Sequence, residues 1–187
     1  MNISKAVLST AMLAATGCSL LSAQEKASVP TKASCLAFVQ EFYAWYVPKA
    51  RATALGSMDA ALKVRRVAFS RHLLKGLQDV DDDARRNQEA GLDFDWILNS
   101  QDPGDPGDPG YLVRNSSLSA NVCRVEVSRQ RPDGETEKIV PELKFEDGRW
   151  LFTNFHYPDS PYPQSENLLG MISAYLKSAR GSPQKPN

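Results

Sequence analysis

Histidine, cysteine and excess charge of either sign are all scarce in this sequence. Its 187 residues include 2 histidines and 3 cysteines, and 22 basic side chains balance 22 acidic ones. A net charge of zero excludes a dedicated nucleic-acid-binding protein, which needs a basic excess on one face. A hydrophobic fraction of 42% excludes global disorder, because enough apolar side chains are present to bury a core. The length suits one compact domain.

Motifs for catalysis and cofactor binding are also missing. The sequence contains no nucleophile elbow, no phosphate-binding loop and no zinc pattern rich in His or Cys. Asp79, Asp81 and Asp83 begin like a calcium loop, but Ala84 stands where that loop needs glycine and Ala90 where it needs glutamate. We therefore expect no metal and no cofactor, and we assign no catalytic residue.

Apolar runs long enough to span a membrane are missing after the N-terminus. Residues 1–23 combine a basic residue, an apolar stretch and small residues up to Ala23, which is typical of a secretory signal peptide. The alternative is a lipoprotein signal over residues 1–17, because the four residues ending at Cys18 resemble a lipobox. Both interpretations predict export to the periplasm, as a soluble protein or one anchored to the outer membrane. Membrane contact is expected only through a lipid on Cys18.

Cys35 and Cys123 remain as a pair once Cys18 is removed or lipidated. An even pair in an oxidising compartment can form a disulfide, and two buried thiols are an equally weighted alternative. Such a disulfide would close a loop of roughly 88 residues and stabilise the fold by about 4 kcal/mol in the chain-entropy model.

Helix signals fill the first half of the domain, which we place at residues 34–180 between a 24–33 linker and a flexible 181–187 tail. The apolar spacing predicts a helix that begins near Thr31 or Ser34 and ends at Pro48. Two serines are expected to cap the next helices. They are Ser57, before a second helix, and Ser70, before a short third helix followed by a polar stretch over 78–91.

Strand signals fill the second half. Alternating apolar and polar residues over 121–129 and 139–145 predict two strands, and Asp147-Gly148 predicts a tight hairpin turn. The segment 149–157 is apolar on both faces, which predicts a central strand that is covered on both sides. A last helix is expected over 165–179. Helices followed by antiparallel strands predict an α+β fold in one domain.

Three groups of residues resemble one bacterial envelope family. They are Phe42-Tyr43-x-Trp45-Tyr46, Gly91-Leu92-Asp93-x-Asp95 with Gln101-Asp102, and Asp147-Gly148-x-Trp150 with Asn154-Phe155-x-Tyr157. In this order, over residues 34–158, the chain resembles the domain-of-unknown-function family numbered 3828, many of whose members are predicted lipoproteins. The resemblance implies the cystatin-like cone of the nuclear-transport-factor-2 superfamily, in which a curved antiparallel sheet wraps a long helix and can leave a pocket. It implies no activity, because the family has no established reaction.

Asp93 and Asp95 are the polar residues of most interest. They alternate with apolar residues, and a carboxylate that is desolvated in a cone pocket can serve as a general base. We favour the interpretation that they hydrogen-bond the backbone of a turn. For His156 a structural role is favoured over a catalytic one. The threefold Asp-Pro-Gly repeat at 102–110 predicts an extended loop rather than a collagen helix or a calcium site.

Three hypotheses for the function remain open. The favoured one is a non-enzymatic envelope domain that binds a protein partner, because a catalytic constellation is missing and the first helix holds more aromatic residues than one buried stripe needs. The second is a pocket for a small apolar ligand, and the third is an acid/base enzyme that uses Asp93 or Asp95. The residues predicted to line a pocket are Tyr43, Trp45, Tyr46, Asp93, Asp95, Trp96, Trp150 and His156.

A basic cluster precedes the third helix. It consists of Lys63, Arg65, Arg66 and Arg71. We expect a solvated helix face, and contact with a partner or a lipid headgroup is the alternative.

Overall fold

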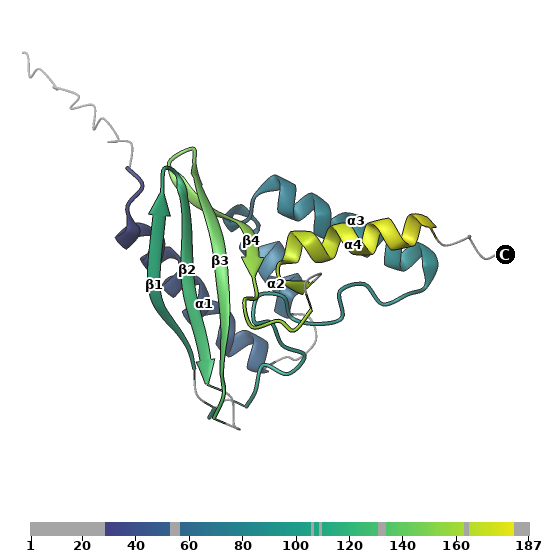
Figure 1. Ribbon diagram of the computed structural model, residues 1–187, viewed down its shortest axis with the longest axis horizontal. Coiled ribbons are helices and arrows are strands. Elements are labelled where there is room, and N and C mark those ends of the chain that lie inside the picture. The colour runs from purple at the N-terminus through teal and green to yellow at the C-terminus, as the bar shows by residue number, and fades with distance from the viewer. Residues whose placement is uncertain are drawn as a thin grey trace, which may run out of the picture.

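The computed structural model describes residues 29–52, 57–105, 107–108, 110–130, 134–162 and 165–181. The chain has an α+β fold, as the sequence predicts, in which a four-stranded antiparallel sheet packs against the long helix α1 (Figure 1). In chain order the elements are α1 (Lys32–Ala52), α2 (Ser57–Val64), the 3-10 turn η1 (Arg66–Ala68), α3 (Arg71–Asn87), β1 (Tyr111–Ser119), β2 (Val122–Gln130), β3 (Thr136–Glu146), β4 (Arg149–His156) and α4 (Leu168–Gly181). The predicted signal segment with Cys18, and the tail beyond Gly181, lie outside the described residues.

Helix α1 begins at a reciprocal cap and runs past a proline. The backbone N–H of Ser34 donates to Oγ1 of Thr31 at 3.0 Å, and the N–H of Thr31 donates to Oγ of Ser34 at 3.2 Å. The prediction that the helix ends at Pro48 is wrong, because α1 continues to Ala52. Proline removes the hydrogen bond to the carbonyl of Ala44, and both residues are exposed, so water can satisfy that carbonyl.

The four strands form an antiparallel meander in the order β1-β2-β3-β4. The β3–β4 turn is the predicted Asp147-Gly148 pair, whose φ angles of 51° and 77° fit a two-residue hairpin. The prediction that the last strand is central is wrong, because β4 pairs only with β3 in the sheet. It is still covered on both faces, as its apolar sequence requires.

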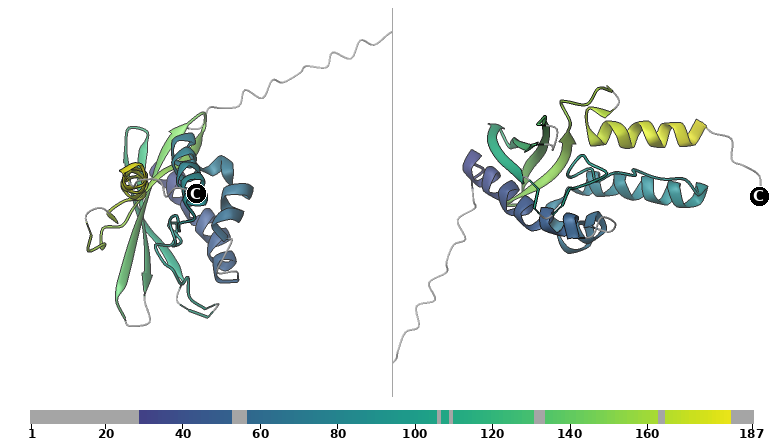
Figure 2. Two further views of the ribbon diagram at one scale, coloured as in Figure 1. Left: turned by 90° about the vertical axis from the view of Figure 1, so that its right-hand side faces the viewer. Right: turned by 90° about the horizontal axis from the view of Figure 1, so that it is seen from below.

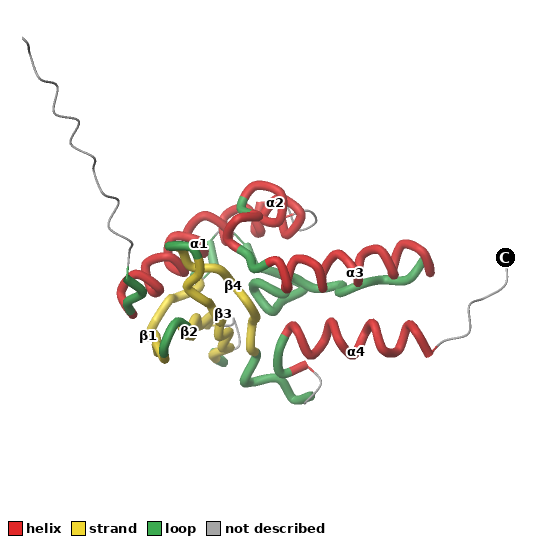
Figure 3. Tube along the Cα trace, turned by 90° about the horizontal axis from the view of Figure 1, so that it is seen from above, coloured by secondary structure: helices red, strands yellow, loops and turns green. Residues whose placement is uncertain are grey.

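Segments from both ends of the domain cover the outer edge of β4. The N–H of Ser70 donates to the carbonyl of Phe152 at 2.9 Å, and the N–H of Tyr157 donates to the carbonyl of Glu166 at 2.8 Å. These contacts bring α3 and α4 side by side next to β4, and both helices extend beyond the sheet (Figures 2 and 3). The covered edge is protected from pairing with another chain.

Helix α3 is longer than the sequence predicts. Ser70 caps it as expected, and its hydroxyl accepts from the N–H of Leu73 at 3.2 Å. The helix then continues to Asn87 through the stretch that we expected to be non-helical. Buried residues keep helical spacing as far as Ala84, and ion pairs such as Lys75–Asp79 support the polar face.

A disulfide joins the helix to the sheet. Cys35 of α1 and Cys123 of β2 are bonded, with their Cα atoms 6.6 Å apart and 88 positions apart in the sequence, so the predicted disulfide is confirmed. Next to it, aromatic rings fill the space between α1 and the concave face of the sheet. The ring of Phe42 lies 4.8 Å from that of Phe152 and 5.7 Å from that of Phe69, between centroids.

Candidate functional site

Asp95 is committed to a turn. The segment 93–102 connects α3 to β1, and in it one carboxylate oxygen of Asp95 accepts from the backbone N–H groups of Ile97 and Leu98 at 2.9 and 3.0 Å. The other oxygen accepts from the hydroxyl of Tyr46 at 2.5 Å. Burial raises the pKa of Asp95, while these hydrogen bonds lower it, and the net shift is upward. This is the turn-stabilising role that we favoured from the sequence.

Three further tyrosines hold the successive carbonyl groups of the same turn. Tyr157 donates to the carbonyl of Trp96 at 2.7 Å, Tyr43 to that of Ile97 at 2.8 Å, and Tyr111 to that of Leu98 at 3.4 Å. We call this turn, 95–98, with its four tyrosines the tyrosine clamp. Burial is the main cause that raises the pKa of each of these three hydroxyls, to about 12 for Tyr111, so they remain neutral donors at physiological pH.

Four of the residues predicted to line a pocket, Tyr43, Tyr46, Asp95 and Trp96, meet in the tyrosine clamp, and the other four lie elsewhere. Tyr43, Tyr46 and Trp96 are at most 3% exposed and pack in the core. Asp93 is exposed, whereas Asp95 is half-buried in the clamp. The structure does not bring these five side chains together around a cavity, because the aromatic core fills the concave side of the sheet.

Trp45 and His156 lie apart from that group. Trp45 is half-buried on α1, with Nζ of Lys49 5.5 Å and the guanidinium carbon of Arg65 5.1 Å from its ring centroid. His156 lies on the convex face of the sheet, where its Nε2 is 3.2 Å from Oε2 of Glu142. Arg124 donates to the same oxygen at 2.7 and 2.9 Å.

The cluster of Glu142, Arg124 and His156 lies at the surface of the sheet. Burial raises the pKa of Glu142, but the hydrogen bonds and charges of Arg124 and His156 outweigh burial, and the pKa lies below its usual 4.5. A carboxylate held ionised by an arginine is a weak base, and the cluster contains no nucleophile. Within the described part of the chain, no group of three or more His, Cys, Asp or Glu side chains could hold a metal ion.

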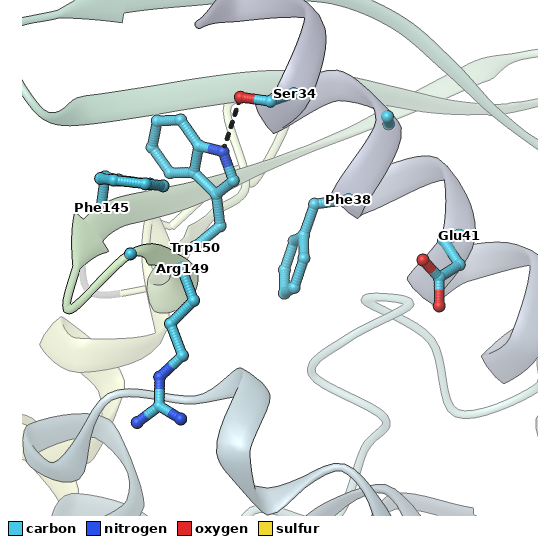
Figure 4. Close-up of a pocket in the computed structure, with 8 residues that line it drawn as sticks. Ser34, Phe38, Glu41, Phe145, Arg149 and Trp150 are labelled. Carbon is cyan, nitrogen blue, oxygen red and sulfur yellow. Dashed lines mark hydrogen bonds between the residues drawn. The ribbon is translucent and has the colours of Figure 1, made fainter. Parts of the chain in front are cut away.

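A pocket of about 390 Å³ lies on the surface between α1 and the β3–β4 hairpin (Figure 4). Its floor is aromatic and is formed by Phe38 on the helix and by Phe145 and Trp150 on the hairpin. The ring centroids of Phe145 and Trp150 lie 5.1 Å apart. The indole N–H of Trp150 donates to Oγ of Ser34 at 3.0 Å, which leaves no unpaired donor in the floor. Trp150 itself is 4% exposed, so the part of the floor that solvent reaches comes mainly from the half-buried rings of Phe38 and Phe145. The full lining comprises Ser34, Ala37, Phe38, Glu41, Phe145, Gly148, Arg149 and Trp150.

Two charges of opposite sign stand at the rim of this pocket. Glu41 and Arg149 are both exposed, and Phe38 lies between Glu41 and Trp150 in Figure 4. An open aromatic floor with charged groups around it is suited to holding an apolar group whose neighbours are polar. The pocket contains no pair of side chains that could act as nucleophile and base.

Of the residues predicted to line a pocket, Trp150 alone belongs to this lining, and sequence analysis missed Phe38, Glu41, Phe145 and Arg149 as site residues. A partial signal was present. Ser34, Phe38 and Glu41 are spaced by four and three positions, so they share one face of a helix. Which part of the sheet meets that face depends on tertiary packing, and no spacing in the sequence carries it.

The Asp-Pro-Gly repeat lies away from the pocket, against two arginines. Arg51 donates to the carbonyls of Pro103 and Asp108 at 3.2 and 3.1 Å, and Arg129 donates to that of Asp102 at 3.1 Å. The repeat is a loop over its described residues, as predicted, but it is not extended throughout, because the N–H of Asp108 donates to the carbonyl of Asp105 in a turn. The carbonyl groups of Asp102, Pro103 and Asp108 therefore accept hydrogen bonds from arginines of the same chain.

Comparison with protein-family models, with curated proteins and with solved structures finds no match for this chain. Over the residues that the structure describes, no helix is both long enough and apolar enough to cross a membrane.

Proposed function

We propose that this protein is an exported, non-enzymatic binding domain, and that the pocket between Phe38 and Trp150 holds an apolar side chain or short apolar segment of a protein partner. The observation that carries the proposal is the pocket itself, an aromatic floor at the surface with its polar atom already hydrogen-bonded to Ser34. Contact with an apolar group would bury this floor without leaving a donor unpaired.

The polar groups elsewhere support binding rather than chemistry. Asp95 is saturated by the tyrosine clamp, and Glu142 is neutralised by Arg124. The rim favours a polypeptide over a purely apolar ligand, because Arg149 can pair with an acidic group of the partner, and exposed Glu41, although 3.4 Å from Arg65, can also accept from a basic group. Such rim pairs contribute orientation more than affinity.

The proposal includes the family resemblance and its cellular setting. A curved sheet around a long helix is the arrangement that the cystatin-like cone would have, and a disulfide suits an oxidising compartment such as the periplasm. Residues 1–23, or 1–17 with Cys18, would direct the chain there. We propose that the domain acts in the bacterial envelope as a soluble or lipid-anchored protein.

A small apolar or amphipathic molecule is the alternative occupant. The volume of about 390 Å³ lies within the range of small-ligand sites, and this observation favours the alternative. The two occupants are distinguished by mass spectrometry of the native protein, because a small ligand adds a discrete mass of a few hundred daltons, whereas a protein partner adds a whole chain.

The proposal is tested by photo-crosslinking in cells. A photoreactive amino acid at Ala37, an exposed lining residue, should yield one discrete crosslinked protein, and the same probe at Lys138 on the sheet should not. Adding Arg149→Ala and Phe38→Ala to the Ala37 probe should remove the product. Phe94→Ala is the matched control, since Phe94 is also a half-buried phenylalanine but lies outside the lining. Identical products from both probe positions would refute the proposal.

A further inference from the structure

The end of α2, Arg65 and the start of η1 together expose apolar side chains beside cations. Val64 and Val67 are 67% and 68% exposed, although valine is usually buried. Together with Lys63, Arg65 and Arg66 they make up five consecutive residues, of which Arg65 is half-buried and the other four are exposed. We call these five residues the valine–arginine patch.

The patch is extended by an aromatic residue of α1. The guanidinium group of Arg65 lies over the half-buried ring of Trp45, and the ammonium group of Lys49 lies near the same ring. A tryptophan that is partly exposed among cations is typical of surfaces that contact the headgroup region of a bilayer. The ring of Trp45 therefore adds apolar surface next to the cations of the patch.

The charge of this region differs sharply from that of the whole chain. Residues 60–74 contain four basic and no acidic side chains, whereas the chain as a whole has a net charge of zero. Glu41 pairs with Arg65 at 3.4 Å and is the acidic residue that the described ion pairs bring to the patch. The surface is therefore complementary to an anionic surface.

We propose that the valine–arginine patch binds the surface of a membrane that contains anionic lipid. The cations would contact lipid phosphates, and the two valines would enter the boundary between headgroups and acyl chains. A nucleic acid or an acidic protein would satisfy the cations but would give the exposed valines less apolar surface to contact. The pocket lies at the N-terminal half of α1 and meets the patch at Glu41, which lines the pocket and pairs with Arg65, but the inference uses no other pocket residue.

The test is sedimentation of the protein with vesicles of phosphatidylglycerol and phosphatidylcholine, compared with vesicles of phosphatidylcholine alone. Every form begins at Gln24, after the proposed signal segment, so that neither the apolar stretch of that segment nor a lipid on Cys18 contributes. Binding should require phosphatidylglycerol and should weaken as ionic strength rises. The double variant Lys63→Gln/Arg66→Gln should lose about 25-fold in the partition coefficient, since each cation near an anionic surface contributes about fivefold.

Matched variants distinguish binding by this patch from a general effect of charge and from a folding defect. Lys138→Gln/Lys177→Gln removes two exposed cations elsewhere and should retain the wild-type partition coefficient within about twofold. Lys63→Arg/Arg66→Lys keeps the charge and should keep binding, which excludes a folding defect. Val64→Ser/Val67→Ser should lose about fivefold or more. Equal binding to both vesicle types, equal losses in patch and control variants, or no loss on removal of the valines would overturn the proposal.

Discussion

The hydroxyl of Tyr46 donates a 2.5 Å hydrogen bond to the carboxylate of Asp95, 49 positions further along the chain. The second oxygen of that carboxylate accepts from two backbone N–H groups, so the residue with the strongest sequence claim to catalysis is used to build a turn. The pair also fixes α1 against the connection between α3 and β1.

Replacement of Asp95 tests this role directly. Asp95→Ala should lower the free energy of unfolding by about 3 kcal/mol, because two N–H groups and one hydroxyl lose their acceptor. Asp95→Asn retains an acceptor for the N–H groups and should cost about 1 kcal/mol. Urea unfolding at neutral pH measures both. Equal stability of the wild type and Asp95→Ala would contradict the structural role.

The difference in stability between the wild type and Asp95→Asn should change with pH in a defined direction. Burial raises the pKa of Asp95 above its usual 3.8 despite its hydrogen bonds, so the folded state holds the proton more tightly than the unfolded state. The stability of wild type relative to Asp95→Asn should be highest below pH 3.8 and should fall as the pH rises through the raised value. Urea unfolding over this pH range measures the difference. A relative stability that increases with pH would be inconsistent with a raised pKa.

The tyrosine clamp predicts unequal effects of removing single hydroxyl groups. Tyr157→Phe and Tyr43→Phe should each lower the free energy of unfolding by about 1 to 3 kcal/mol, because each leaves a buried carbonyl without its donor. Tyr162→Phe is the matched control, since Tyr162 is exposed, and should change stability by less than about 0.5 kcal/mol. Thermal or urea unfolding compares the three variants, and similar losses in all of them would rule out the clamp.

Glu142 should show the opposite pH dependence to Asp95. Burial raises the pKa of Glu142, but the hydrogen bonds and charges of Arg124 and His156 lower it by more than burial raises it. The pKa therefore lies below the usual 4.5. The stabilisation of wild type relative to Glu142→Gln should be fully present above pH 4.5 and should be lost as the pH falls through the lowered value. Acid titration of stability with both proteins measures it. No pH dependence of the difference would mean that the carboxylate is not held ionised by its partners.

The disulfide should supply a large part of the stability. Cys35→Ser/Cys123→Ser should lower the free energy of unfolding by about 4 kcal/mol, because the bond closes a long loop in the unfolded chain. Reduction of the wild type should have a similar effect, and the double variant should be insensitive to reductant. Urea unfolding with and without reductant checks both statements. A wild type that is unaffected by reduction under unfolding conditions would contradict the bond.

Local signals in the sequence predicted much of the fold. The cap at Ser70, the turn at Asp147-Gly148 and the alternation within β2 each act through neighbouring residues, so they are visible in the sequence. The predictions failed where tertiary contacts override a local preference. Pro48 is tolerated within α1 because the carbonyl that loses its backbone hydrogen bond is exposed to water. Helix α3 continues to Asn87 because α4 packs against its apolar face.

The candidate site was less accessible to sequence analysis. Trp150 was identified as a site residue, but its partner Phe38 lies 112 positions earlier, and their meeting depends on how α1 crosses the sheet. The clamp was hidden for the same reason, because its four tyrosines come from distant segments of the chain. The tyrosines can be seen in the sequence, but the carbonyl groups to which they donate can be identified only from the fold.

The affinity of the crosslinked partner for two arginine variants tests the central claim most directly. Ala37→Arg places a long charged side chain at the pocket, and Ala44→Arg places the same side chain at another exposed position of the same helix. Titration calorimetry should give an affinity at least about 30-fold weaker for Ala37→Arg, corresponding to about 2 kcal/mol, and an unchanged affinity for Ala44→Arg. Equal affinities of the wild type and both variants would contradict the assignment of the pocket as the binding site.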